Sequence, residues 1–97
     1  MLDSKKRATL RGLANTEETI VHIGKGGVTP SVITQVEEAL AARELVKGRV
    51  LESAMLTPNA VLETLCEALR AEPVMTIGTR FVLYRKNPKN PKIDLGK

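Results

Sequence analysis

Residues 20–30 read Ile-Val-His-Ile-Gly-Lys-Gly-Gly-Val-Thr-Pro, and this stretch decides the fold. The β-branched apolar residues of 19–23 predict a strand. The glycines that follow allow a sharp turn and a close approach to a ligand. Thr29 before Pro30 predicts a helix start, because threonine caps helices and proline fits the first helical position. A helix N-terminus presents unpaired N–H groups and a positive dipole end, so the stretch predicts a phosphate site with Lys25 inside it.

A second helix start of the same kind occurs at residues 56–58, which read Leu-Thr-Pro. Hydrophobic periodicity and turn residues then predict the remaining elements. The predicted helices run from Ser4 to about Asn15, from Pro30 to Arg43 and from Pro58 to about Ala71, and the predicted strands are Thr19–Ile23, Leu45–Leu51, Val74–Ile77 and Arg80–Arg85. The last two strands are joined by Gly78-Thr79, a two-residue hairpin turn with glycine first.

This order predicts a single α/β domain, α-β-α-β-α-β-β, with a mixed four-stranded sheet packed with helices. Two crossover helices make the first three strands parallel, and the hairpin adds an antiparallel fourth. Strands three and four carry apolar residues on both faces. The first helix is therefore expected on the face opposite the other two. We predict a domain at residues 2–86 and a basic Pro/Asn/Lys tail at 87–97.

Ninety-seven residues with 42% apolar content suit one small globular domain with one core. The N-terminal residues show no apolar signal-peptide segment, and no run is long enough to span a membrane. The single cysteine, Cys66, excludes an internal disulfide and fits a reducing compartment. The expected location is the cytoplasm.

The net charge of +4 is unevenly distributed along the chain. Residues 1–14 carry +3 and residues 80–97 carry +5, whereas the middle carries −4. Basic ends around an acidic centre favour a polyanionic partner, although mobile termini also collect lysine. The only aromatic residues are Phe81 and Tyr84. A nucleic-acid-binding protein of this composition would recognise the sugar-phosphate backbone and the shape of the nucleic acid rather than stack on its bases.

Groups for catalysis are scarce. The chain has one histidine, one cysteine and two aspartates, at positions 3 and 94. His22 has no partner at metal-ligand spacing and is interpreted as a structural residue; Cys66 is interpreted as a buried, inert thiol. The side chains of adjacent glutamates point in different directions on a helix, so these glutamate pairs are interpreted as solvent-exposed surface residues. We therefore predict no enzyme, no cofactor and no metal.

Nucleotide motifs can be tested directly in the glycine loop. A dinucleotide fingerprint starting at Gly24 requires glycine at position 29, which is Thr29, and no P-loop string exists. What remains is a GxxG sequence, Gly24 to Gly27. It is short, but it can pass along a nucleic-acid backbone. The same string also occurs as a bare turn in many proteins.

Four blocks in order are similar to a known family: residues 6–14, 23–29, 43–47 and 77–85. Together they resemble the CRM domain (chloroplast RNA splicing and ribosome maturation) in its stand-alone prokaryotic form, the YhbY family. The resemblance spans about residues 2–86. It implies a fold related to the C-terminal domain of translation initiation factor three. It also implies RNA binding through the GxxG loop, association with large-subunit ribosomal RNA precursors, and a part in ribosome assembly.

The predicted RNA-binding residues are the glycine loop and flanking cations. They are Gly24, Lys25, Gly26, Gly27, Val28, Lys5, Lys6, Arg11, Lys47, Arg49, Arg80, Arg85 and Lys86. The alternative is a protein-interaction module of the translation apparatus whose basic surface is incidental. A monomer is expected.

The predicted second strand departs from the family pattern at Gly48, where the family usually has an apolar β-branched residue. The smaller residue is expected to weaken the strand by about 1 kcal/mol. Lys47 and Arg49 are expected on the strand face opposite Gly48.

Overall fold

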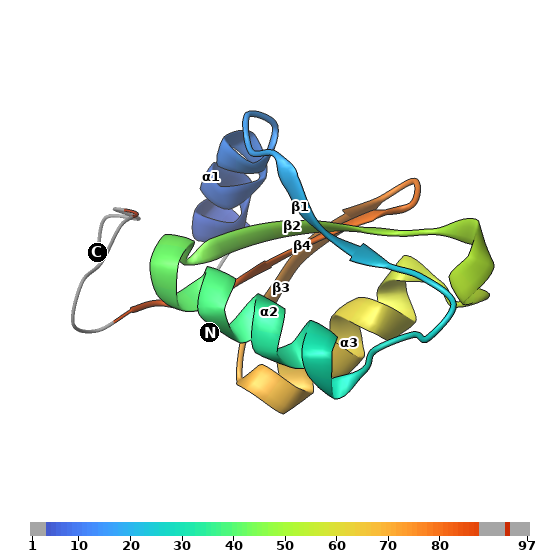
Figure 1. Ribbon diagram of the computed structural model, residues 1–97. Helices are drawn as coiled ribbons and strands as arrows, with labels where there is room; N and C mark the ends of the chain where they lie inside the picture. The colour runs from blue at the N-terminus through green and yellow to red at the C-terminus, as the bar shows by residue number, and fades with distance from the viewer. Residues whose placement is uncertain (1–3, 88–92, 94–97) are drawn as a thin grey trace.

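The computed structural model describes residues 4–87 and 93 of the chain. Its elements are α1 (Ser4–Ala14), β1 (Thr19–Ile23), α2 (Pro30–Arg43), β2 (Leu45–Val50), the 3-10 turn η1 (Glu52–Ala54), α3 (Pro58–Leu69), β3 (Glu72–Ile77) and β4 (Arg80–Tyr84). They form a single α/β domain with one mixed sheet, as predicted (Figure 1). The short η1 turn was not predicted.

The strand order in the sheet is β1-β2-β4-β3. β1 pairs parallel with β2, and β4 pairs antiparallel with both β2 and β3. The first three strands therefore point the same way, which confirms the predicted directions. β4 is inserted between β2 and β3, a position that the order of elements along the chain does not reveal.

The two helix starts are built alike, as the sequence indicates. The Thr29 hydroxyl accepts a hydrogen bond from the amide of Val32 at 3.2 Å, and the Thr57 hydroxyl accepts one from Ala60 at 3.1 Å. Each bond satisfies one of the donors that a helix N-terminus leaves unpaired. Threonine and proline together thus set where α2 and α3 begin.

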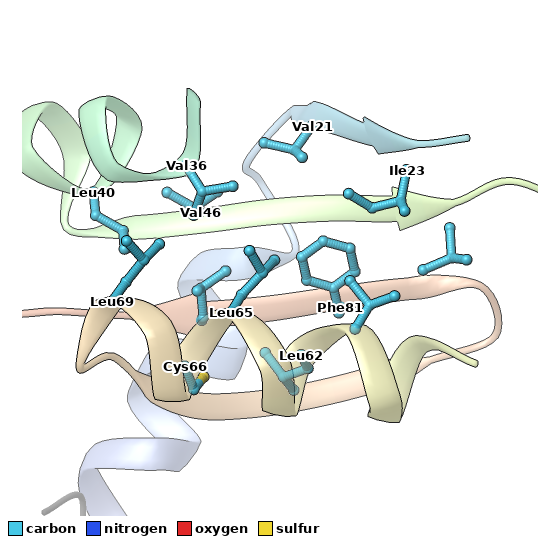
Figure 2. Packing of buried hydrophobic residues seen from close by; sticks show 13 residues of the cluster. Val21, Ile23, Val36, Leu40, Val46, Leu62, Leu65, Cys66, Leu69 and Phe81 are labelled. Carbon is cyan, nitrogen blue, oxygen red and sulfur yellow. The ribbon is translucent and has the colours of Figure 1, made fainter. Parts of the chain in front are cut away.

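The main core lies between the sheet and the two helices α2 and α3 (Figure 2). Alternate residues of the strands point into it, among them Val21 and Ile23 from β1 and Phe81 from β4. They meet buried leucines such as Leu40 of α2 and Leu65 of α3. Burial of this apolar surface is the main stabilising contribution of the domain.

The opposite face of the sheet is covered in part by α1, which confirms the prediction for the first helix. Leu10 and Ala14 of α1 pack against Leu45, Val82 and Tyr84. These strand residues are the start of β2 and the second half of β4, which lie at one end of the sheet because β2 and β4 are antiparallel. The exposed strand residues of this face lie toward the other end of the sheet.

Gly48 is a packing requirement, so the expectation that it weakens β2 is wrong. It lies opposite Phe81 in the register of β2 and β4. A Cβ atom on Gly48 would lie 2.2 Å from Cζ of Phe81, whose side chain is fully buried. The aromatic ring thus occupies the space that a side chain at position 48 would need. An aromatic residue covering a cross-strand glycine is a known way to stabilise a sheet.

A buried carboxylate organises the chain after β4. Glu44 has a left-handed backbone (φ 66°) and is fully buried. Its carboxylate oxygens accept hydrogen bonds from the amides of Asn87 at 2.6 Å and Ile93 at 2.7 Å. Two positions of the predicted tail are therefore attached to the domain. The rest of that tail, residues 88–92 and 94–97, lies outside the described residues, and the boundary at 86 stays a prediction.

Among the helices of the described ranges, none combines the length and the apolar character that crossing a membrane requires.

We predict that Gly48→Ala lowers the free energy of unfolding by about 2 kcal/mol, the usual cost of overpacking a core. In a Phe81→Leu background the same change should cost little, because the smaller side chain leaves room for the methyl group. Urea unfolding of the two single variants and the double variant measures this coupling. Additive effects would show that the ring does not occupy the space at Gly48.

Candidate functional site

The loop between β1 and α2 is a tight turn with open amides. The amide of Gly27 donates to the carbonyl of Gly24 at 2.9 Å, and Gly27 has a φ of 69°. This positive φ favours glycine at position 27. Within the described part of the chain, the amides of Lys25, Gly26 and Val28 donate to no protein acceptor. The turn therefore uses the Gly27 amide itself and leaves its neighbours available to a ligand.

Two other segments support this loop from the same end of the sheet. The carbonyl of Ile23 accepts from the amide of Leu51, and the carbonyl of Thr79 accepts from Val50, both at 2.8 Å. A Cβ atom on Gly27 would lie 3.4 Å from Cδ1 of Leu56. The glycine loop, the η1 segment and the tip of the β3–β4 hairpin thus lie together at one end of the domain (Figure 1).

The loop is also fixed to the start of α2. Val28 and Ile33 are both half-buried and pack against the main core, as expected for a hydrophobic staple across the Thr29 cap. Lys25, in contrast, is exposed. An exposed cation therefore lies beside the N-terminus of α2, whose position is fixed by packing.

A basic row crosses the open part of the sheet face that α1 partly covers. His22 of β1 pairs in register with Arg49 of β2, and Arg49 pairs with Arg80 of β4. All three are exposed, and no hydrogen bond or ion pair joins their side chains to any other described residue. We call His22, Arg49 and Arg80 the basic row. It reaches the glycine loop, because Gly24 follows His22 by two residues.

His22, interpreted from the sequence as a structural residue rather than a metal ligand, lies on the open face of the sheet. The side chain is exposed, whereas Val21 and Ile23 on either side of it are buried. The alternation of apolar and polar residues in β1 was the signal that placed it on the open face. It is the one member of the basic row that sequence reasoning left out.

The direct pairing of Arg49 with Arg80 is unfavourable by itself. Like charges directly opposite each other on neighbouring strands repel and destabilise the pair. No carboxylate of the described residues forms an ion pair with either guanidinium. An anion bound between the two arginines would remove this repulsion. The pair is therefore suited to a phosphate.

Two other predicted cations, Arg85 and Lys86, do not join the loop. Arg85 forms an ion pair with Glu37 and donates to the carbonyl of Leu69, so it ties α2 to the end of α3. Lys86 lies near the C-terminal end of α2. There the side-chain amide of the next residue, Asn87, donates a hydrogen bond to the carbonyl of Ala41. Since α2 is about 20 Å long, that end is remote from the glycine loop.

The remaining predicted cations lie on or beneath α1. Lys47 is half-buried and donates to the carbonyl of Ala14 at 3.2 Å, which fixes the C-terminus of α1 to β2. Lys5 and Arg11 are exposed on α1, and Lys6 is half-buried and has an interaction partner. These residues are on the same side of the sheet as the basic row, because α1 packs on that face.

The described residues form no metal-binding cluster at this surface, and the single cysteine is buried in the main core. Among the described residues, no group of three or more His, Cys, Asp or Glu side chains could hold a metal ion. Cys66 is buried, and burial, with a smaller contribution from the carboxylate of Glu72, raises the pKa of its thiol to about 11. A protonated, covered thiol is a poor nucleophile. The predicted burial of Cys66 is confirmed, and the raised pKa of its thiol agrees with an unreactive side chain.

The chain is similar to known proteins over almost its whole length. The CRS1 / YhbY (CRM) domain family matches residues 2–85 of the chain. A protein of Bacillus subtilis (strain 168) named "Probable RNA-binding protein YqeI" is 41% identical over 95 residues, covering 98% of this chain and 99% of that protein. An "RNA-binding protein" of Haemophilus influenzae is 33% identical over 94 residues, covering 97% of this chain and 94% of that protein.

A solved structure has the same fold. The hypothetical protein SAV1595 from Staphylococcus aureus, determined in solution, superposes with a TM-score of 0.78 at 37% sequence identity, covering 99% of this chain and 100% of that one. The chain belongs to the CRS1 / YhbY (CRM) domain family, which confirms the resemblance seen in the sequence.

We predict that the free energy of unfolding falls as pH rises from 9 toward about 11, in part because Cys66 holds its proton more tightly when folded. Its contribution is complete below pH 9 and is lost through the folded pKa, up to about 2–3 kcal/mol. Tyr84, whose pKa is also raised, mainly by burial, adds to the loss above pH 10. Urea unfolding of wild type and Cys66→Val across this range isolates the thiol; parallel profiles would contradict the assignment.

We predict that Arg80→Gln stabilises the free protein by about 0.5 kcal/mol at low salt, because it removes the repulsion with Arg49. The gain should shrink as salt is added, since salt screens exposed charges. Thermal unfolding at several salt concentrations measures it, with Lys86→Gln as the control for the change in net charge. An equal gain in both variants would mean that net charge, rather than the cross-strand pair, causes the effect.

Proposed function

We propose that this protein binds RNA through the glycine loop and the basic row, and that it associates with large-subunit ribosomal RNA precursors during ribosome assembly. The observation that carries the proposal is the meeting of open loop amides with unpaired arginines at one end of the sheet. Both features are suited to phosphate. The surface offers positioning and charge rather than reactive groups, so the proposed role is binding without catalysis.

The loop supplies one phosphate site. The open amides of Lys25, Gly26 and Val28 can donate to phosphate oxygens, and the N-terminus of α2 adds the positive end of its dipole. The Lys25 ammonium contributes a compact charge that can adjust to the position of the phosphate. None of these contacts reads a base, so the loop should bind many RNA sequences.

The basic row supplies the continuation of the site. Arg49 and Arg80 lie in directly opposed positions on neighbouring strands, so one phosphate can bind between them. Arginine can donate two parallel hydrogen bonds to a phosphate. An RNA backbone that passes the glycine loop would reach this pair across His22. Lys5, Lys6 and Arg11 on α1 would extend the surface on the same side of the sheet.

The comparisons support the chemical class of the partner. Relatives that match almost the whole chain carry names that describe RNA-binding proteins. The choice of ribosomal RNA precursors, and of assembly as the process, rests on the resemblance to the stand-alone prokaryotic branch of the family. Arg85 and Lys47 are assigned to the stability of the fold, because each has a protein partner.

We predict that Lys25→Ala weakens binding to large-subunit ribosomal RNA fragments several-fold and lowers the slope of log affinity against log salt by about 1. Lys86→Ala is the matched control, since it removes the same charge at the other end of α2. A salt series with wild type and both variants makes the measurement.

The possible results separate the alternatives. Equal effects of the two variants would show that net charge alone drives binding and would remove Lys25 from the site. No retention of RNA by the wild type, even at low salt, would overturn the proposal. It would then favour a protein-interaction module with an incidental basic surface.

A further inference from the structure

We propose that Met55, supported by Leu56, contacts the face of an unpaired RNA base next to the phosphate held by the glycine loop. This inference rests on the proposed function and deepens it, because it names the kind of RNA: a single-stranded or bulged segment rather than a regular duplex. It assigns a role to the η1 segment, which the sequence did not single out.

Met55 is the most exposed large apolar side chain of the described residues. Its side chain is 91% exposed, against 60% for Ile77, 43% for Leu56 and 40% for Leu13. A single exposed apolar residue is ordinary on a protein surface. Here two consecutive ones, Met55 and Leu56, stand beside a loop with open amides, and this position distinguishes them.

The backbone at Met55 is also unfavourable for methionine. Its φ is 55°, in the left-handed region, where side chains other than glycine cost free energy. Gly27, nearby, has the same sign of φ and has no side chain to strain. The domain therefore holds a methionine where glycine would be more stable. Glu44 and Arg70, which follow α2 and α3, also have a positive φ, so this angle alone does not single out Met55.

The contacts of the segment place Met55 at the site. Leu56 lies against Gly27, with its Cδ1 atom 3.4 Å from the position of a Cβ. On the other side of Met55, the Ser53 hydroxyl lies 4.0 Å from the corresponding position on Gly24. Ser53 and Leu56, which lie on either side of Met55 in the sequence, are thus both close to the glycine loop. A nucleotide whose phosphate binds the loop would have its base within reach of the Met55 side chain.

The chemistry of the surface favours an unpaired base as the occupant. The two aromatic side chains of the protein, Phe81 and Tyr84, are 0% and 5% exposed, so neither can stack on RNA. A methionine thioether is polarizable and makes favourable contacts with aromatic rings. In a duplex the faces of the bases are stacked inside, and only unpaired bases present them.

Charge near Met55 favours the same occupant. Glu52, at the start of η1, is exposed. Its carboxylate repels phosphates that come close to it, and the second strand of a duplex would bring additional phosphates to this end of the domain. A single strand can place its backbone along Lys25 and the basic row, with a base toward Met55.

The test uses two RNA stems of identical sequence that differ by one bulged nucleotide. We expect the wild type to bind the bulged stem about two- to tenfold more tightly, the range expected from the strength of methionine–aromatic contacts. Met55→Gly should abolish this preference while leaving the affinity for the regular stem and its salt slope unchanged. Because glycine accepts a positive φ, its thermal midpoint should be equal to or above that of wild type.

Two further variants sharpen the result. Met55→Phe enlarges the apolar surface and should increase the preference for the bulged stem, and Leu13→Ala, which shortens an exposed apolar side chain on α1, should leave it unchanged. Lys25→Ala should weaken binding to both stems and keep their ratio. The inference is overturned if wild type does not discriminate, or if Met55→Gly preserves the ratio. Failure of wild type to bind either stem would instead overturn the proposed function.

Discussion

The packing of Phe81 over Gly48 sets the register at the centre of the sheet. β2 and β4 are the two inner strands, so every other element packs directly or indirectly on their pairing. A slip of one residue would turn the ring away from the only position of β2 that lacks a side chain, and would exchange the core and solvent faces of β4. The same register places Arg80 opposite Arg49. One apolar contact on the core face thus decides the arrangement of charges on the open face.

The two ends of the domain differ in how their polar groups are used. At the C-terminal end of α2, the Glu44 carboxylate accepts hydrogen bonds from two backbone amides, and Arg85 forms an ion pair with Glu37. At the other end, where β1 passes into the glycine loop, the amides of Lys25, Gly26 and Val28 and the guanidiniums of Arg49 and Arg80 have no protein partner among the described residues. Satisfied groups stabilise the fold, whereas unpaired groups at the surface are available to a ligand. The contrast explains why cations that are equivalent in the sequence divide into structural and candidate binding residues.

Two features that are unfavourable by themselves lie at the second end. Arg49 faces Arg80, and Met55 holds a left-handed backbone with an exposed apolar side chain. The packed scaffold behind them tolerates these costs, because Thr29 and the staple of Val28 with Ile33 anchor the loop to α2. A phosphate between the arginines and a base against Met55 would offset the costs on binding.

Local patterns in the sequence determined the elements, their order and the glycine loop. The pairs Thr29-Pro30 and Thr57-Pro58, the alternation in β1 and β2, and the glycine-first hairpin turn act between near neighbours, so they can be read without a structure. Four blocks in order also indicated the family. Only the tertiary structure decided the strand order, the necessity of Gly48 and the partners of Lys47 and Arg85. These features depend on contacts between residues far apart in the chain, such as Gly48 with Phe81 and Arg85 with Glu37. The residue pattern of a single segment does not indicate which side chain from a distant part of the sequence packs against it.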